Sequence, residues 1–329
     1  MASSEPPALS PLSFPPATFA KLTPGPFLLA HLQPSNPKTP PTRPSGRSLL
    51  ETRKPTVQTG SLSHSNGSAV VRIGGTAVVV GVRAEILRAQ DIPHLSSPDI
   101  EDEISSLGLL VPNLELSTGS SPQNLPGNAP SSLAQSLTHR LQSQLHSTRL
   151  VRGEDLRIEA EEEDEDGNMK KVVKAYWALH IDALLISADG CVFDAAWAAV
   201  RAALADTRLP GARWDADREN VVCSARRADA RKLELSATRP IAASFAAFST
   251  QSKVRGEDGR AWILADPDAF EDGVCSESIT VTVGAKGQIL RVEKSGGLVI
   301  GVDETETLIE EAQHRWAEWD MALLQARAD

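Results

Sequence analysis

The sequence contains little cysteine and no long apolar run. Its three cysteines, Cys191, Cys223 and Cys275, lie far apart and match neither a zinc-ligand spacing nor a disulfide framework, so we expect no metal and a reducing compartment. No apolar stretch reaches the roughly 18 residues that a membrane-spanning helix needs. The first residues also lack a basic segment followed by an apolar one. We therefore expect no membrane partner, no secretory signal and no cofactor.

Proline sets apart an N-terminal arm, residues 1–42. Thirteen of the 22 prolines fall within the first 55 residues. Because proline fixes φ and removes a backbone donor, this arm cannot be a packed domain of regular structure. It nevertheless carries Phe19, Leu22 and Phe27, and Pro26 suits the first turn of a short helix. The arm is expected to dock on another surface.

The formal net charge of −10 depends strongly on one segment. Seven of the eight residues from Glu159 to Asp166 are acidic, and without them 33 basic residues face 36 acidic ones. The total charge therefore does not exclude a nucleic-acid partner. The run itself is interpreted as a solvated loop or hairpin tip, with an acidic recognition element as the alternative.

Short β-branched runs in both halves of the chain predict strands. In the first half, Ala69–Ile73 and Thr76–Val82 flank a turn at Gly74 and Gly75. The second half has four such runs, with a hairpin turn at residues 285–287. These four runs are Ile241–Phe248, Ala261–Ala265, Ser278–Val283 and Ile289–Glu293.

Two further segments show the period of a helix that faces a core. In residues 133–150, leucines recur at a spacing of four, starting at Leu133. The last helix is expected to begin at Asp303, which Glu306 can assist in capping. Together, strands and helices predict an α+β fold of two pseudo-duplicated units, residues 43–211 and 238–329, joined by a charged, irregular connector at residues 212–237.

The stretch from Val172 to Pro210 organises the first unit. Residues 175–187 are apolar enough on both faces to predict a central strand, and Ala188, Asp189 and Gly190 form a turn. Residues 191–205 contain seven alanines, which favour a helix lying close to a sheet. A strand, a tight turn and a helix can present an anion to the N–H groups of the first helical turn. The sequence thus predicts either a surviving or a lost anion site there.

Seven segments occur in an order that is typical of one family. They are the Phe/Leu-rich arm, RPSGR, GSAVVRIGGTAVVVGVRAE, LVPNLEL, LLISADGCVFDAAWAAVRAAL, RPIAASFAAF and ILADP with its following hairpin. This series resembles ribonuclease PH-fold proteins, and more narrowly the ring subunits of the eukaryotic RNA exosome, over about residues 12–325. The resemblance implies two β-α units, a ring of six such subunits and a central pore for single-stranded RNA.

The resemblance also implies that the catalytic residues are missing. Active relatives hold inorganic phosphate with an arginine at the start of the long helix, where this chain has Phe193. A catalytic aspartate of the second unit corresponds to Ser278, although the neighbouring Glu277 is an alternative proton donor. We therefore expect a catalytically inert member of a phosphorolytic family. The competing hypothesis is an active phosphate-dependent 3′-to-5′ exoribonuclease that uses a displaced cation such as Arg201 or Arg239.

The remaining expectations concern RNA and partners. By resemblance, the loop after the strand that ends near Glu85 lines the pore entrance, which makes Arg88 a candidate RNA contact and Arg83 a weaker one; ordinary surface charges are the alternative. Arg43 and Arg47, in RPSGR, are expected to clamp the arm rather than form a plain surface loop. The implied partners are other ribonuclease PH-fold ring subunits, S1/KH-type cap subunits and single-stranded RNA, in nucleus, nucleolus and cytoplasm. A free RNA-binding module outside any ring is the third hypothesis.

Overall fold

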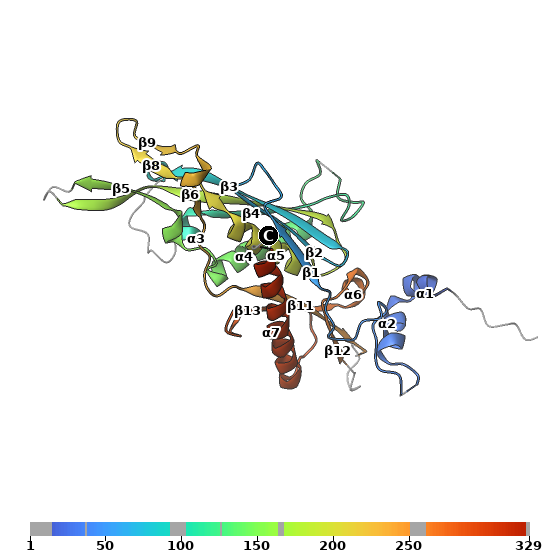
Figure 1. Ribbon diagram of the computed structural model, residues 1–329. Helices are drawn as coiled ribbons and strands as arrows, with labels where there is room; N and C mark the ends of the chain where they lie inside the picture. Colours follow the sequence, from blue (N-terminus) through green and yellow to red (C-terminus); the bar gives the residue numbers. More distant parts are fainter. Residues whose placement is uncertain are drawn as a thin grey trace, which may run out of the picture.

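The described residues form two main β-sheets, of six and four strands, and two small two-stranded sheets, with helices between and beside the main sheets (Figure 1). The computed structural model describes residues 15–36, 38–92, 103–125, 127–163, 168–250 and 261–326. Mixed helices and antiparallel strands give the α+β class that the sequence predicts.

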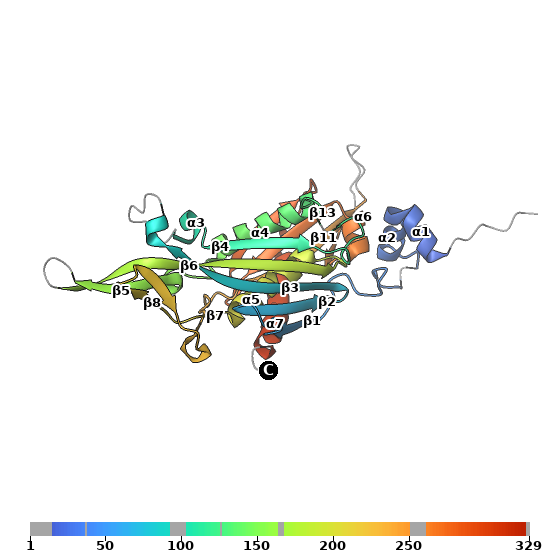
Figure 2. The same ribbon diagram turned by 90° about the horizontal axis from the view of Figure 1, so that it is seen from above.

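The first sheet has six strands (Figure 2). Its order is β1-β2-β3-β6-β4, and β5 pairs with the far end of β6. Only the β4–β6 pair is parallel; the other pairs are antiparallel. The strands are β1 (Pro55–Thr59), β2 (Gly67–Ile73), β3 (Thr76–Arg88), β4 (Leu110–Leu116), β5 (Arg157–Glu163) and β6 (Met169–Ser187).

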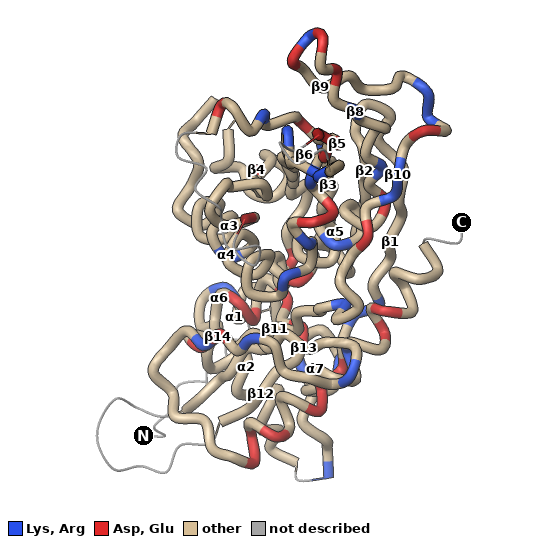
Figure 3. Tube along the Cα trace, turned by 90° about the vertical axis from the view of Figure 1, so that its left-hand side faces the viewer, with Lys and Arg blue, Asp and Glu red and all other residues tan. Residues whose placement is uncertain are grey.

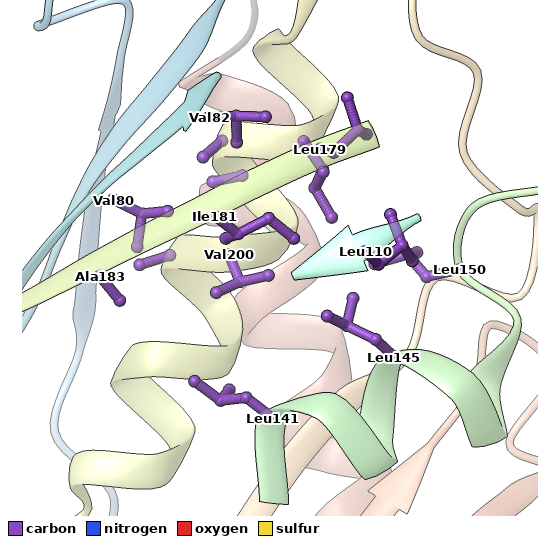
Figure 4. Packing of buried hydrophobic residues seen from close by; sticks show 14 of the residues in the cluster. Val80, Val82, Leu110, Leu141, Leu145, Leu150, Leu179, Ile181, Ala183 and Val200 are labelled. Carbon is purple, nitrogen blue, oxygen red and sulfur yellow. The ribbon is translucent and has the colours of Figure 1, made fainter. Parts of the chain in front are cut away.

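Two helices, α4 (Ser132–Thr148) and α5 (Val192–Asp206), cover one face of this sheet. Helix α5 is buried almost all round, which its alanines permit because they allow close approach to β2 and β3. Leucines of α4 and valines of β3 complete the core, as Figure 4 shows for Leu141, Leu145, Val80 and Val82. Leu133 is 55% exposed, so the leucine stripe predicted for α4 starts one turn later.

The opposite face of the first sheet is only partly covered: residues 175–177 of β6 are all buried, whereas every second residue from 182 to 186 is exposed. Along β6, buried residues alternate with Asp182, Leu184 and Ile186, the last two being 40% and 44% exposed. The predicted central strand is confirmed, because β6 lies between β3 and β4, but one face of its last residues is exposed. An apolar strand with one open face is what an antiparallel sheet tolerates.

The second sheet has the order β12-β11-β13-β14, all antiparallel. Its strands are β11 (Ile241–Ser249), β12 (Ala261–Ala265), β13 (Glu277–Val283) and β14 (Ile289–Ser295). One face packs on the first half of α7 (Val302–Gln325), through Leu308 and Ala312. The second half of α7 reaches the first core through Trp319 and Leu323. Helix α7 therefore joins the two units.

The arm forms two short helices, α1 (Pro16–Leu22) and α2 (Pro24–Leu32), which lie at the side of the molecule away from β5 (Figures 1 and 2). Leu28 and Leu32 of α2 pack with Trp262 and Leu264 of the second sheet. Phe27 contacts Phe270 of α6 (Ala269–Val274) at a ring separation of 5.8 Å. The arm therefore docks on the second unit.

Two other segments differ from the sequence expectations. The connector contains a hairpin of β8 (Ala212–Asp215) and β9 (Asn220–Cys223), followed by β10 (Arg231–Lys232), which pairs with β7 (Arg208–Leu209). Its charged residues therefore do not prevent strand pairing. Helix α7 begins after Gly301 without a side-chain cap, so the predicted cap at Asp303 is wrong. Helix α3 (Glu103–Leu107) and three 3₁₀ turns, at Ala89–Asp91, Gly153–Leu156 and Arg227–Asp229, complete the described elements.

The acidic run lies on a hairpin. Glu159 to Glu163 belong to β5, which pairs with β6 as far as Glu163 opposite Met169. Lysines of β6 face this strand, with Lys174 at a separation of 2.5 Å from Glu162. Residues 164–167 lie outside the described residues. Elsewhere basic and acidic segments are interleaved over both units (Figure 3).

Candidate functional site at the start of helix α5

The turn between β6 and α5 has a fixed backbone. Thr76 accepts a hydrogen bond from the Asp189 N–H at 2.8 Å and donates one to the Gly190 carbonyl at 2.7 Å. Gly190 has φ +74°, and a Cβ atom there would lie 2.2 Å from the carbonyl oxygen of Pro267. Only glycine meets both conditions without strain. The sequence Ala-Asp-Gly thus seats the second unit directly against the start of α5.

Arg53 ties the turn to the second unit. Its guanidinium donates to both Asp266 carboxylate oxygens, at 2.7 and 2.8 Å, and to the Asp189 carbonyl at 2.6 Å. Burial opposes the charge of Arg53, but the hydrogen bonds and charge of Asp266 prevail and raise its pKa. Burial likewise opposes the charge of Asp266, yet Arg53 holds the pKa of that carboxyl below its ordinary value. This pair is bidentate and therefore fixes geometry as well as charge.

The protein's own carboxylates surround the first turn of α5. Burial raises the pKa of Asp272 of α6 to about 6, and an interaction with the Cys191 backbone opposes that rise. Asp194 accepts from the Ser244 N–H at 2.8 Å and from the Ser244 hydroxyl at 2.6 Å. Burial raises the pKa of Asp194 to about 6 as well. When ionised, both carboxylates repel an incoming anion.

Phe193 occupies the neighbouring position and is only 4% exposed. The guanidinium carbon of Arg140, from α4, lies 3.9 Å from the centre of its ring. Arg140 also donates to Glu293 at 2.9 Å and to the Thr280 hydroxyl at 3.1 Å. The cation in contact with Phe193 is therefore paired with a carboxylate and stacked on an aromatic face.

The space beside Asp194 is very small. The cavity lined by Asp194, Ser244, Asp266 and Arg315 measures about 10 Å³. A volume of that size holds at most about one water molecule. Neither inorganic phosphate nor a nucleotide fits there in this conformation.

The two candidate positions of the second unit lie on opposite faces of β13. Ser278, Thr280 and Thr282 share one face by strand alternation, and that face contacts α4, because Thr280 bonds Arg140 and Thr282 bonds Gln144 at 2.7 Å. Glu277 lies on the other face and accepts from the Gly297 N–H at 2.7 Å. Burial opposes its charge, but the Leu298 and Gly297 N–H groups and Lys294 lower its pKa. The Ser278 side chain therefore lies on the face of β13 that is turned toward α4 and the start of α5, and the Glu277 side chain lies on the opposite face.

The displaced cations lie away from the start of α5. Arg201 follows Phe193 by eight residues, which is about 12 Å along a helix axis. It pairs with Asp320 at 3.1 Å, and Arg239 pairs with the same carboxylate at 2.6 Å. The two arginines therefore share the Asp320 carboxylate, away from Phe193.

The candidate RNA contacts are exposed. Arg83 lies on the open face of the first sheet and pairs with Asp182 at 3.1 Å. Arg88 is the last residue of β3, not part of a loop, because the strand continues three residues beyond Glu85. It pairs with Asp91 at 2.8 Å. Exposed pairs of this kind contribute little energy, so both arginines can exchange partners.

Arg43 and Arg47 join the chain after the arm to the second unit. Arg43 is 1% exposed, donates to Glu271 at 2.7 Å and to the Ala265 carbonyl at 2.6 Å. Arg47 donates to the Asp266 carbonyl at 3.0 Å, and burial together with nearby Arg43 lowers its pKa. Residues 43–54 therefore pack on the second unit, although the sequence grouped them with the first.

Sequence reasoning missed Asp272, Arg140 and Arg53. A signal existed for Asp272, since Asp268 and Glu271 form a capping box that predicts the start of α6. Arg140 carried no such signal, because its contacts, with Phe193, Thr280 and Glu293, are all distant in the sequence. Over the part of the chain that the structure describes, no cluster of three or more His, Cys, Asp or Glu could hold a metal ion. Within the same residues, no helix has the length and apolarity to cross a membrane.

Comparisons with known proteins point to one family. A model described as the 3′ exoribonuclease family, domain 1, of RNase PH type matches residues 51–210. The exosome complex component rrp43 of Schizosaccharomyces pombe is 34% identical over 286 residues, which cover 87% of this chain and 90% of that protein. The exosome complex component Rrp42 of Methanothermobacter thermautotrophicus is 30% identical over 77% of this chain and 79% of its own length.

Solved structures share the fold. The chain superposes on a subunit of the Archaeoglobus fulgidus exosome, solved with RNA bound to the active site, with a TM-score of 0.64, 22% identity and coverage of 90% of this chain and 95% of that one. An archaeal exosome core gives a TM-score of 0.57 at 21% identity, with 85% and 91% coverage.

Proposed function

This chain belongs to the RNase PH family of 3′ exoribonucleases, and on that premise we propose that it is a non-catalytic ring subunit of the RNA exosome core. The observation that carries the proposal is the 34% identity to an exosome component over 87% of the chain, combined with the closed start of α5. In this role the protein scaffolds the ring and its RNA channel for rRNA processing and 3′-to-5′ RNA decay.

Three features of the α5 start support the absence of phosphorolysis. Phosphorolysis needs a cation for the attacking phosphate and a proton donor for the leaving ribose oxygen. Phe193 provides no charge, and the adjoining Arg140 is paired with Glu293. Ser278, which faces the site, has no acidic proton at neutral pH. The Asp272 carboxylate also lies close enough to interact with the Cys191 backbone, just before the helix.

A scaffold can still contact RNA through phosphates without reading sequence. Arg83 and Arg88 support this part of the proposal, because both are exposed and held only by surface ion pairs. Their removal should weaken binding of single-stranded RNA and lower its salt dependence.

The assembly partners follow from the same proposal. They are other ribonuclease PH-fold ring subunits and S1/KH-type cap subunits, in nucleus, nucleolus and cytoplasm. The test is mass spectrometry of proteins that co-purify with a tagged full-length copy, together with imaging of a tagged copy. We expect several ribonuclease PH-fold proteins in stoichiometric amounts. A monodisperse monomer without such proteins would contradict the proposal.

A further inference from the structure

A basic segment follows helix α5. Residues 208–232 contain seven Lys or Arg and four Asp or Glu, a net charge of +3, which leaves 26 basic and 39 acidic residues in the rest of the chain. The segment includes the β8–β9 hairpin, which contacts β5 at the side of the molecule away from the arm (Figures 1 and 2). A polyanion is therefore attracted to this segment and repelled by the net charge of the rest.

A cavity of about 430 Å³ opens between the hairpin and the residues that follow it. Arg213 and Val222 lie opposite each other in the hairpin, and both line this cavity. Their neighbours Trp214 and Val221 pack on the core of the first unit, so strand alternation turns Arg213 and Val222 outward. The volume lies in the range of small-ligand sites and accommodates a nucleotide.

Hydrogen bonds hold the far wall of the cavity in place. The Ser224 N–H donates to the Gly211 carbonyl at 2.7 Å. The Ser224 hydroxyl donates to the Asp229 carboxylate at 2.5 Å and accepts from the Arg226 N–H at 3.2 Å. The wall is thus preorganised, which lowers the entropy that is lost when a ligand binds.

Two guanidinium groups and one carboxylate line the cavity. Arg226 pairs with Asp229 at 3.2 Å, whereas no ion pair engages Arg213 within the part of the chain that the structure describes. The Arg226 side chain is 83% exposed, so its ion pair is weak and Arg226 can exchange partners. One positive charge therefore remains without a counter-charge, on a group whose planar fork matches the geometry of phosphate.

We propose that this cavity, here named the Arg213–Arg226 site, holds a backbone phosphate of single-stranded RNA. Arg213 and Arg226 contact the phosphate, and Val222 contacts the attached nucleoside. The volume favours RNA over an acidic protein segment, because one carboxylate side chain fills only part of it. The site extends the proposed function, on which the choice of RNA rests, by a contact that involves neither Arg83 nor Arg88.

The test is a titration of a fluorescently labelled oligouridylate with the purified full-length chain, followed by fluorescence anisotropy at several chloride concentrations. Arg213→Gln combined with Arg226→Gln should weaken binding about tenfold at low salt and reduce the slope of log K against log salt by about one, because a phosphate contact releases counterions. The matched control combines Lys38→Gln with Lys286→Gln, which removes the same charge at two exposed positions and should leave the affinity close to that of the wild type.

A second pair of variants tests the cavity itself. Val222→Glu places a carboxylate directly opposite Arg213 and should weaken RNA binding about as much as the double arginine variant, whereas the neutral Val222→Gln should bind within about twofold of the wild type. If the double arginine variant does not fold, this pair alone still decides. Equal RNA affinity of the wild type, the double arginine variant and Val222→Glu would overturn the proposal.

The rival occupant is tested with a labelled oligoglutamate in the same assay. Oligoglutamate that binds more tightly than the RNA, and loses this binding in Val222→Glu, would assign the site to an acidic protein segment and overturn the proposal. Arg83→Gln combined with Arg88→Gln reports on the other candidate RNA contacts separately. An absence of co-purifying ring subunits would count against the proposed function, whereas RNA binding by the isolated chain is measured independently of it.

Discussion

The two ends of helix α5 differ in the side chains and in the cavity volume beside them. At its start, the Asp272 carboxylate interacts with the Cys191 backbone, Phe193 is packed under Arg140, and the cavity beside Asp194 measures about 10 Å³. Toward its end, Arg201 and Arg239 line a cavity of about 140 Å³ with one carboxylate between them. A helix start attracts anions by its dipole, yet here the protein's own side chains satisfy it. The larger cavity lies at the other end.

The largest loss of stability is expected from a substitution that pushes the turn before α5 away from the second unit. Gly190→Ala places a Cβ 2.2 Å from the Pro267 carbonyl oxygen at a positive φ, so the two units must separate. We expect a loss of about 3 kcal/mol or more in the free energy of unfolding, measured by urea denaturation. Gly25→Ala is the matched control, because nothing lies within 4 Å of the added Cβ. Equal stability of the two variants would show that the contact is not tight.

The next effect concerns the lost cation. Phe193→Arg removes a buried ring and brings a second guanidinium next to Arg140, which should destabilise the chain by about 3 kcal/mol. We expect no phosphate-dependent RNA cleavage, because Ser278 does not supply the acid and the Asp272 carboxylate remains beside the Cys191 backbone. Phe193→Leu controls for packing. Release of nucleoside diphosphate by the Phe193→Arg variant would show that the charge alone had been missing.

A third prediction concerns pH. Burial raises the pKa of Asp194 from 3.8 to about 6, so the folded state binds a proton that the unfolded state has already lost between these values. The contribution of Asp194 to the free energy of unfolding is therefore greatest below about pH 4. It falls by about 3 kcal/mol as the pH rises to about 6.

The matching variant is Asp194→Asn, which can keep the contacts with Ser244. Its unfolding free energy should fall less than that of the wild type between pH 4 and pH 7, with the slope reduced and not abolished, since Asp272 titrates similarly. Identical pH profiles would mean that Asp194 remains ionised throughout. Asp217→Asn, in the exposed β8–β9 turn, should leave the profile unchanged.

The smallest effect is expected at the open end. Arg239→Gln removes one of two partners of Asp320, and Arg201 remains. We expect a change of about 1 kcal/mol or less in urea denaturation, because the Arg239 side chain is 39% exposed. A much larger loss would show that the Arg239–Asp320 pair is a main contact of α7 and not a minor exposed one.

The sequence predicted the elements better than the site. Strands such as Ala261–Ala265 were predicted with correct bounds, because β-branched and aromatic runs carry a local signal. Phe193 was identified from the resemblance, and the structure places it in a packed position. Its neighbours were not predictable: Arg140 reaches Glu293 across 153 residues, and Arg201 reaches Asp320 across 119. Contacts of that separation depend on how the two units dock, which no local pattern encodes.

The most direct test of the closed α5 start is phosphorolysis by the complex that co-purifies with this chain. The complex is incubated with single-stranded RNA and inorganic phosphate, and release of nucleoside diphosphates is measured for the wild type and for Arg140→Gln, which removes the cation in contact with Phe193. The account predicts the same release from both complexes, whatever its level. Phosphate-dependent release that Arg140→Gln abolishes, with the complex still assembled, would contradict it.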